Sequence, residues 1–146
     1  MNNKTVNSVH LSFWIISAVM LIWNVMGAMN LLWQISADAD MLASFPETHR
    51  AIIEGRPIWA TAGFAVCVFA GALGCLLLLL RKSAAYYLFI ASLLGVIVTM
   101  IHTTNVASSI IRFNFPEIFV MILMPMMVAV FLIWYSKFAE RKGWIN

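Results

Sequence analysis

Four long stretches of this chain contain no charged residue, and this pattern constrains the fold more than any other feature. The stretches without aspartate, glutamate, lysine or arginine are residues 11–37, 57–80, 83–111 and 118–136. A helix needs about 20 apolar residues to cross the hydrocarbon of a bilayer. The apolar runs are continuous and do not alternate, which favours helices over the strands of a membrane barrel. The predicted spans, with boundaries uncertain by several residues, are 11–35, 58–80, 84–105 and 116–136.

The composition is typical of a membrane protein. Hydrophobic residues make up 63% of the chain and charged residues 10%, with a mean hydropathy of +0.92, whereas soluble domains carry about 25% charged residues. So few polar groups could not cover the surface of a small soluble domain. We expect an all-α fold, with residues 1–146 as one up-and-down four-helix membrane bundle in a lipid bilayer. The first stretch is longer than the apolar region of a signal peptide, so we interpret it as a retained span.

Lysine and arginine are unequally divided between the two ends of the predicted bundle. The end with both termini holds Lys4, Arg81, Lys82, Lys137, Arg141 and Lys142 against Glu140 alone. The other end holds Arg50, Arg56 and Arg112 against five carboxylates. Because cytoplasmic loops carry the excess of positive residues, we predict cytoplasmic termini. The loops over residues 38–56 and 106–115 would then face outward. The scattered cations form no basic stripe, so no nucleic-acid partner is expected.

The loop between the first two spans has a helical pattern of its own. Ser44 and Glu47 have the spacing of a capping box, which predicts Ser44 as the N-cap of a helix that ends before Pro57. The charge pattern indicates a short amphipathic helix on the outer membrane surface. We favour a connector that buries its apolar face, with a lid over an outer opening as the alternative. Asp38 and Asp40 provide too few oxygens for a calcium site, and we expect no metal ligands here.

Polar side chains form one arc on the first span and another on the third. The first arc contains Trp23, Asn24, Gly27, Asn30 and Gln34, and the second contains Ser92, Gly95, Thr99, His102 and Thr103. Both arcs should face the bundle interior, because an unpaired amide in lipid costs several kcal/mol. We favour hydrogen bonds between the two helices. The alternative is an outward-facing cavity with His102 as its titratable group. Its binding residues would be Trp23, Asn24, Asn30, Gln34, Thr99 and His102.

Small residues recur along the second span at spacings of about four. The stripe includes Gly63, Cys67, Gly71 and Gly74. Small residues let membrane helices approach closely, so the stripe predicts a helix–helix contact. Cys67 and Cys75 are eight residues apart, which is about 12 Å along a helix and too far for a disulfide.

Pro125 lies among methionines in the fourth span and predicts an irregular helix, either a static kink, which we favour, or a hinge. None of the four spans contains a carboxylate, and His102 is the only histidine within a span. No nucleophile is paired with a base in a recognisable motif. We therefore expect no catalytic residue, no metal site and no cofactor.

Some sequence segments are similar to a known family. They are residues 21–27 (LIWNVMG), 57–59 (PIW), 69–74 (FAGALG) and 77–82 (LLLLRK). On these segments, the stretch from Phe13 to about Ile101 resembles a family of uncharacterised four-span bacterial inner-membrane proteins, often labelled "sugar transporter". The resemblance implies the four-span fold and a bacterial inner membrane. It implies no catalytic or binding residues.

The sequence favours a non-enzymatic membrane component, which is structural or accessory to a partner. The partner would be another membrane protein or further copies of the same chain, and the residues do not distinguish the two. The alternative function is binding or transport of a small solute in an outward-facing polar cavity.

Overall fold

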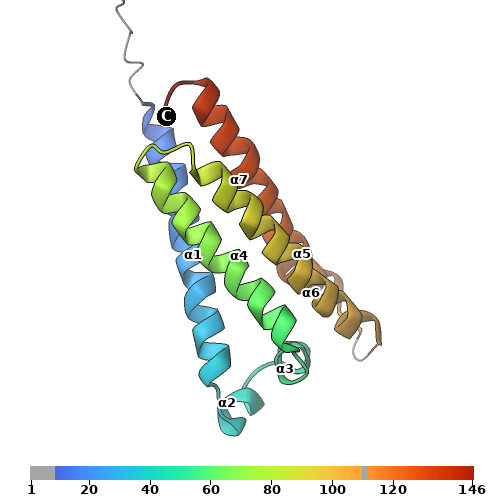
Figure 1. Cartoon of the computed structure of the whole chain (residues 1–146). Coiled ribbons are helices and arrows are strands. Elements are labelled where there is room, and N and C mark those ends of the chain that lie inside the picture. Colours follow the sequence, from blue (N-terminus) through green and yellow to red (C-terminus); the bar gives the residue numbers. More distant parts are fainter. Residues whose placement is uncertain (1–8, 110–111) are drawn as a thin grey trace, which may run out of the picture.

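A computed structural model describes residues 9–109 and 112–146, and within these ranges the chain contains helices and turns but no strand (Figure 1). The elements are α1 (Leu11–Ser36), α2 (Ala39–Ala43), α3 (Glu47–Glu54), α4 (Ile58–Leu79), α5 (Ala85–Ser109), α6 (Phe115–Ile118), the π-helix η1 (Phe119–Leu123) and α7 (Met124–Arg141). Lys4, which contributed to the predicted charge asymmetry, lies outside the described residues.

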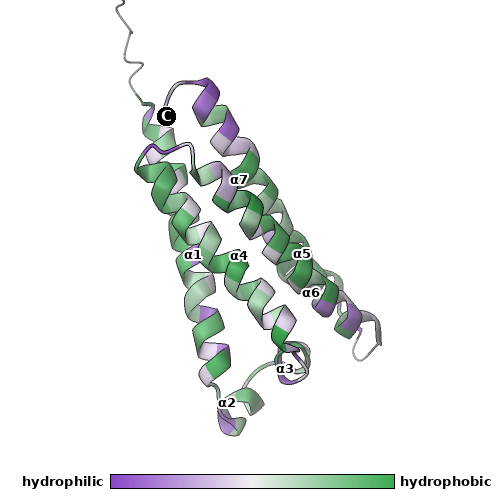
Figure 2. Cartoon of the chain, in the orientation of Figure 1, coloured by the Kyte–Doolittle hydropathy of each residue, from purple (hydrophilic) through white to green (hydrophobic). Residues whose placement is uncertain are grey.

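Four helices in the described part are long and apolar enough to cross a membrane. They are Leu11–Ser36, Ile58–Leu79, Ala85–Ser108 and Phe115–Arg141, the last of which combines α6, η1 and α7. The prediction of an all-α bundle with four long apolar helices is therefore confirmed. Hydrophobic residues predominate along these helices (Figure 2). Their length and composition identify the chain as a membrane protein.

The helices contact one another in the order α1, α4, α5, α7. α4 packs against both α1 and α5, and α5 also packs against α7. α1 and α7 approach each other at the end of the bundle that holds the C-terminus, and they diverge toward the end that carries α2 and α3 (Figure 1). We call these the closed end and the loop end.

Aromatic side chains hold α1 and α7 together at the closed end. The ring of Phe13 is stacked on that of Tyr135, with centroids 6.4 Å apart, and the Trp144 ring meets the Phe13 ring edge-on at 5.8 Å. Phe13 is completely buried in this cluster, together with Leu78 and Leu132. The buried cluster therefore packs α1 against α7 at this end.

The C-terminal tail adds a second fastening at the closed end. Gly143 has a φ of +70°, a conformation that glycine adopts readily, and it turns the chain back after α7. The N–H of Asn146 donates to the carbonyl of Arg81, and the N–H of Ser83 donates to the carbonyl of Asn146. Arg81 Nε donates to the carbonyl of Trp144 at 2.6 Å. The tail is thereby joined to the turn between α4 and α5.

The short helix between the first two spans is present, but the predicted capping box is wrong. α3 begins at Glu47 with Pro46 as its N-cap, and no side chain caps it. Asp38 accepts a hydrogen bond from the N–H of Met41 and starts the additional helix α2. Ser44 therefore falls at the end of α2, where its hydroxyl donates to the carbonyl of Met41. A capping box does occur in the chain, at the start of α6.

The fourth span leaves α-helical geometry over Phe119–Leu123, shortly before Pro125. The N–H of Met124 donates to the carbonyl of Phe119, five residues earlier, which is a π-helical bond. Proline has no N–H to complete the normal ladder, and a wider turn is one way to accommodate this loss. The irregularity predicted at Pro125 therefore takes the form of the π-helix η1.

Candidate functional site

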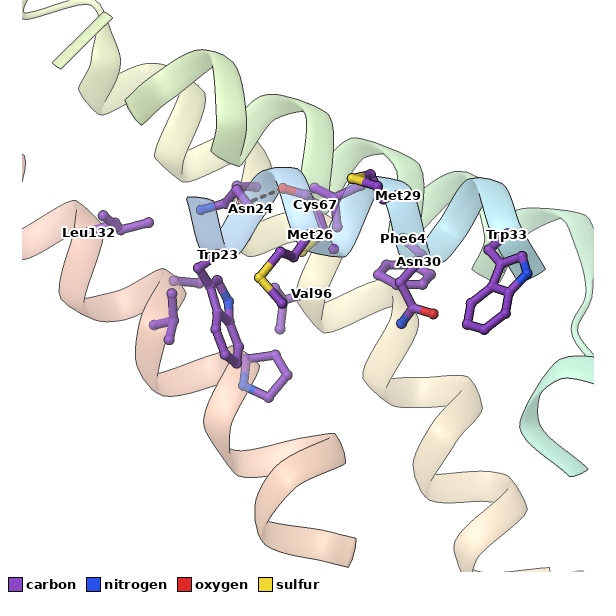
Figure 3. Close-up of a pocket in the computed structure, with 16 residues that line it drawn as sticks. Trp23, Asn24, Met26, Met29, Asn30, Trp33, Phe64, Cys67, Val96 and Leu132 are labelled. Carbon is purple, nitrogen blue, oxygen red and sulfur yellow. Dashed lines mark hydrogen bonds between the residues drawn. The ribbon is translucent and has the colours of Figure 1, made fainter. Parts of the chain in front are cut away.

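A cleft of about 630 Å³ opens between α1 and α7 where the two helices diverge (Figure 3). α4 and α5 contribute its floor. We call it the lateral cleft, because it opens between two spans. Its lining is mostly apolar and includes Trp23, Met26, Met29, Trp33, Phe64, Val68, Val96, Pro125, Val128, Ala129 and Leu132.

A second cavity of about 230 Å³ adjoins the lateral cleft on the side of the loop end. We call it the polar chamber. Its polar lining residues are Asn30, Gln34, His49, Arg56, Thr99 and Thr103. The two cavities share Asn30, Phe64, Cys67, Val96 and Pro125 in their walls. The two cavities therefore adjoin along the bundle, and the polar side chains of the second lie among apolar ones such as Ile52, Met100 and Val120.

Asn24 lies at the part of the lateral cleft nearest the closed end. The residue is only 7% exposed. Its side-chain N–H group donates to the carbonyl of Met20 at 2.9 Å and to Cys75 Sγ at 3.7 Å. The amide oxygen is in close contact with Gly71 of α4, where a Cβ atom would collide with it. Asn24 therefore joins α1 to α4, and Trp23 beside it lines the cleft.

Asn30 and Gln34 form a polar pair at the boundary between the two cavities. Gln34 Nε2 donates to Asn30 Oδ1 at 3.2 Å. Asn30 lines both cavities, and it projects from α1 on the same side as Trp23 and Trp33 (Figure 3). Gln34 lines the polar chamber, and its buried Oε1 atom has no hydrogen-bond partner.

His102 fastens the loop end and does not line either cavity. Its ring Nε2 is hydrogen-bonded to the carbonyl of Ile52 in α3 at 3.1 Å, and its ring meets that of Trp59 edge-on. A second bond holds α3 as well, from the hydroxyl of Thr48 to Glu117 Oε1 at 3.0 Å. These contacts hold α3 across the ends of α5 and α6.

The two polar arcs face a common space but are not bonded to each other. The hydrogen bonds of the arc side chains run within their own helix or to α3 and α4. The hydroxyl of Thr99 donates to its own helix, at the carbonyl of Gly95, and Thr103 donates to the carbonyl of Thr99. Ser92 donates to the carbonyl of Cys67 in α4 at 2.7 Å. α4 packs against both helices, and the arcs line different sides of the polar chamber.

Glycines bring α4 and α5 into backbone contact. A Cβ on Gly95 would lie 2.5 Å from both the N atom of Cys67 and the carbonyl oxygen of Gly63. Gly63 faces Val98, and Gly74 faces the ring of Phe89. Sequence reasoning assigned Gly95 to a polar arc and missed its packing role. The signal in the sequence was that Gly63 and Gly95 lie at similar depths in two spans that are joined by a tight turn.

Like His49, Arg56 lines the polar chamber although sequence reasoning did not assign it to a site. Its Nε atom is buried and has no hydrogen-bond partner, and its guanidinium carbon is 5.4 Å from the centroid of the Phe64 ring. Burial lowers the pKa of Arg56, although arginine stays charged at neutral pH. No carboxylate lines either cavity. The signal in the sequence was an arginine two residues before an apolar span.

No protein-family model, curated protein or solved structure matches this chain. In the part of the chain that the structure describes, no group of three or more His, Cys, Asp or Glu side chains could hold a metal ion. The lateral cleft and the polar chamber are therefore the features from which a function can be argued.

Proposed function

We propose that this chain is a non-enzymatic membrane protein that binds a small molecule with an apolar body in the lateral cleft. The observation that carries the proposal is a cleft of about 630 Å³ with a mainly apolar lining. Ligand sites in proteins are typically about 300–1,000 Å³ in volume and combine apolar walls with a few polar groups. Asn24, Asn30 and Ser92 are such polar groups here.

The position of the cleft favours exchange of the ligand with the bilayer. It opens between two membrane-length helices, so an apolar molecule could enter from lipid without crossing water. The closed end is filled by Phe13, Leu78 and Leu132, all fully buried. Transport across the membrane would require a path through this packed end. Binding from the bilayer requires none, and we prefer it.

We also infer that both termini are cytoplasmic in a bacterial inner membrane, so that the loop end faces outward. The support is the excess of Lys and Arg at the closed end, where Arg81, Lys82, Arg141 and Lys142 lie. The resemblance to four-span bacterial inner-membrane proteins supports the choice of membrane.

A second candidate function is that of an accessory subunit, in which a helix of a partner or of a second copy fills the lateral cleft. Met26 and Met29 favour it, because both line the cleft and are largely exposed. Flexible methionines are common on surfaces that accept varied partners.

Binding can be tested with a neutral spin-labelled chain, the methyl ester of doxyl-stearic acid, and protein in a mild detergent. We expect an immobilised component in the electron spin resonance spectrum that saturates with ligand. Met26→Trp should abolish it by filling the cleft. Ile22→Trp is the matched control, because Ile22 is equally exposed one turn away and lines neither cavity. Equal binding by both variants would contradict the proposal, and a stable dimer that excludes the probe would favour the accessory function.

A further inference from the structure

We propose that the polar chamber binds the anionic head group of a lipid from the bilayer, with Arg56 as its ion-pair partner and the hydrocarbon tail in the lateral cleft. This inference rests on the proposed function and specifies its ligand. Three separate features of the chamber support it: its charge, its unsatisfied polar atoms and the wall that it shares with the cleft.

The charge of the chamber is positive because Arg56 lines it and no carboxylate does. Arg50, on the preceding helix α3, forms an ion pair with Glu54, with Arg50 Nε 3.8 Å from Glu54 Oε1. Among the residues that the structure describes, Arg56 has no such ion pair, and its Nε makes no hydrogen bond. The Phe64 ring stabilises the cation only in part. A half-buried guanidinium without a counter-charge is unfavourable, and an anionic oxygen would remove that penalty.

The chamber also contains an acceptor that lacks a donor. Gln34 Oε1 is buried and unpaired, while the amide nitrogen of the same side chain is bonded to Asn30. A hydroxyl group on the head group would satisfy this oxygen. His49 and Thr103 supply further polar atoms in the chamber wall. The chemistry of the wall therefore suits an anion with a nearby hydroxyl.

The arrangement of the two cavities suits one amphipathic molecule. Asn30, Phe64 and Pro125 line both cavities. One lipid could therefore place its head group in the chamber and its tail in the cleft. Arg56 precedes the first residue of α4 by two positions, which places it near the depth of lipid head groups. The cleft continues along α1 from Asn30 past Trp23, toward the closed end. A free anion would use the chamber alone and would leave the cleft empty.

The test compares doxyl-stearic acid, ionised at mildly alkaline pH, with its neutral methyl ester on the full chain in detergent. We expect Arg56→Gln to weaken binding of the acid by about tenfold, the size of a lost charge-assisted hydrogen bond, and to leave the ester unchanged. Arg56→Lys, which keeps the charge, should retain most of the affinity for the acid. Arg50→Gln is the matched control and should change neither probe, because Arg50 lines neither cavity.

The outcomes separate the two proposals. If wild-type protein binds neither probe, the proposed function fails. If it binds both equally and Arg56→Gln changes neither or weakens both alike, only the head-group inference fails. If Arg56→Gln does not fold, a measurement on wild-type protein still tests the head-group inference. Native mass spectrometry after reconstitution in equal amounts of phosphatidylglycerol and phosphatidylcholine should show retention of the anionic lipid, and equal retention of the two lipids would overturn the inference.

Discussion

The closed end and the loop end of the bundle are built from the same helices but pack in different ways. At the closed end, Phe13 and Tyr135 stack across α1 and α7, and the C-terminal tail is bonded to the α4–α5 turn. Toward the loop end the same two helices diverge around the lateral cleft. Lipid is as apolar as leucine, so hydrophobicity does not by itself drive membrane helices together. Specific shape and hydrogen bonding decide which pairs close.

The close contact between α4 and α5 differs from the contact between α1 and α7. Their backbones touch because Gly63 and Gly95 remove the side chains between them. The fourth span contains no glycine and has several methionines. η1 and Pro125 also widen its helix where it lines the cavities. α7 therefore cannot approach α1 in the way that α5 approaches α4. Three experiments test the differences in packing between parts of the bundle.

The largest effect is expected from Gly95→Ala. Its Cβ would lie 2.5 Å from backbone atoms of α4, which cannot rotate away as a side chain could. We expect a loss of about 3 kcal/mol or more in the free energy of unfolding, measured by denaturation in mixed micelles. Gly55→Ala is the control, because its nearest contact would be an ordinary 3.8 Å, and it should change stability by less than about 1 kcal/mol. Similar stability of the two variants would refute the backbone contact.

The next effect compares aromatic side chains at the two ends. Phe13→Ala removes a completely buried ring at the closed end, and we expect it to cost about 3 kcal/mol of stability. Trp23→Ala removes a larger ring from the wall of the lateral cleft, where it is 40% exposed. We expect about 1 kcal/mol or less there, because few packing contacts are lost. If Trp23→Ala proved the more destabilising, the cleft would be packed against something in the folded protein.

The smallest effect concerns the attachment of α3 at the loop end. His102→Phe removes the hydrogen bond to Ile52 and keeps a ring beside Trp59. Loss of this bond should lower the free energy of local unfolding of α3 by about 1 kcal/mol. Hydrogen exchange over residues 47–54 should become about fivefold faster while α4 is unchanged. Thr48→Val, which removes the bond to Glu117, should have a similar effect. Unchanged exchange in both variants would exclude these bonds as the fastening of α3.

The positions of the four spans could be predicted because hydropathy and charge are properties of each segment alone. The short helix before α4 was also expected, but its start was not, since Asp38 begins α2 and leaves Ser44 at the wrong end of a helix. Asp38 and Ser44 are both residue types that cap helix N-termini, and both lie in this loop. Only the folded backbone of the loop shows which of them caps a helix.

The candidate site was less accessible from the sequence. Asn24 is buried, and Asn30 and Gln34 lie at a cavity wall, but His102 is bonded to α3 and lines neither cavity. The spacing of residues along a helix shows which of them share a face, but not which other helix or loop that face contacts. The unpaired state of Arg56 depends equally on what surrounds it.

The sequence by itself therefore determined a membrane protein of four apolar helices, because the bilayer acts on every segment in the same way. Only the tertiary structure decided that α4 lies between α1 and α5, that α1 and α7 meet at one end, and that a cleft remains at the other. The physical reason is that helices in lipid gain little from apolar burial as such. Their partners are chosen by pairwise fit, which involves residues far apart in the chain.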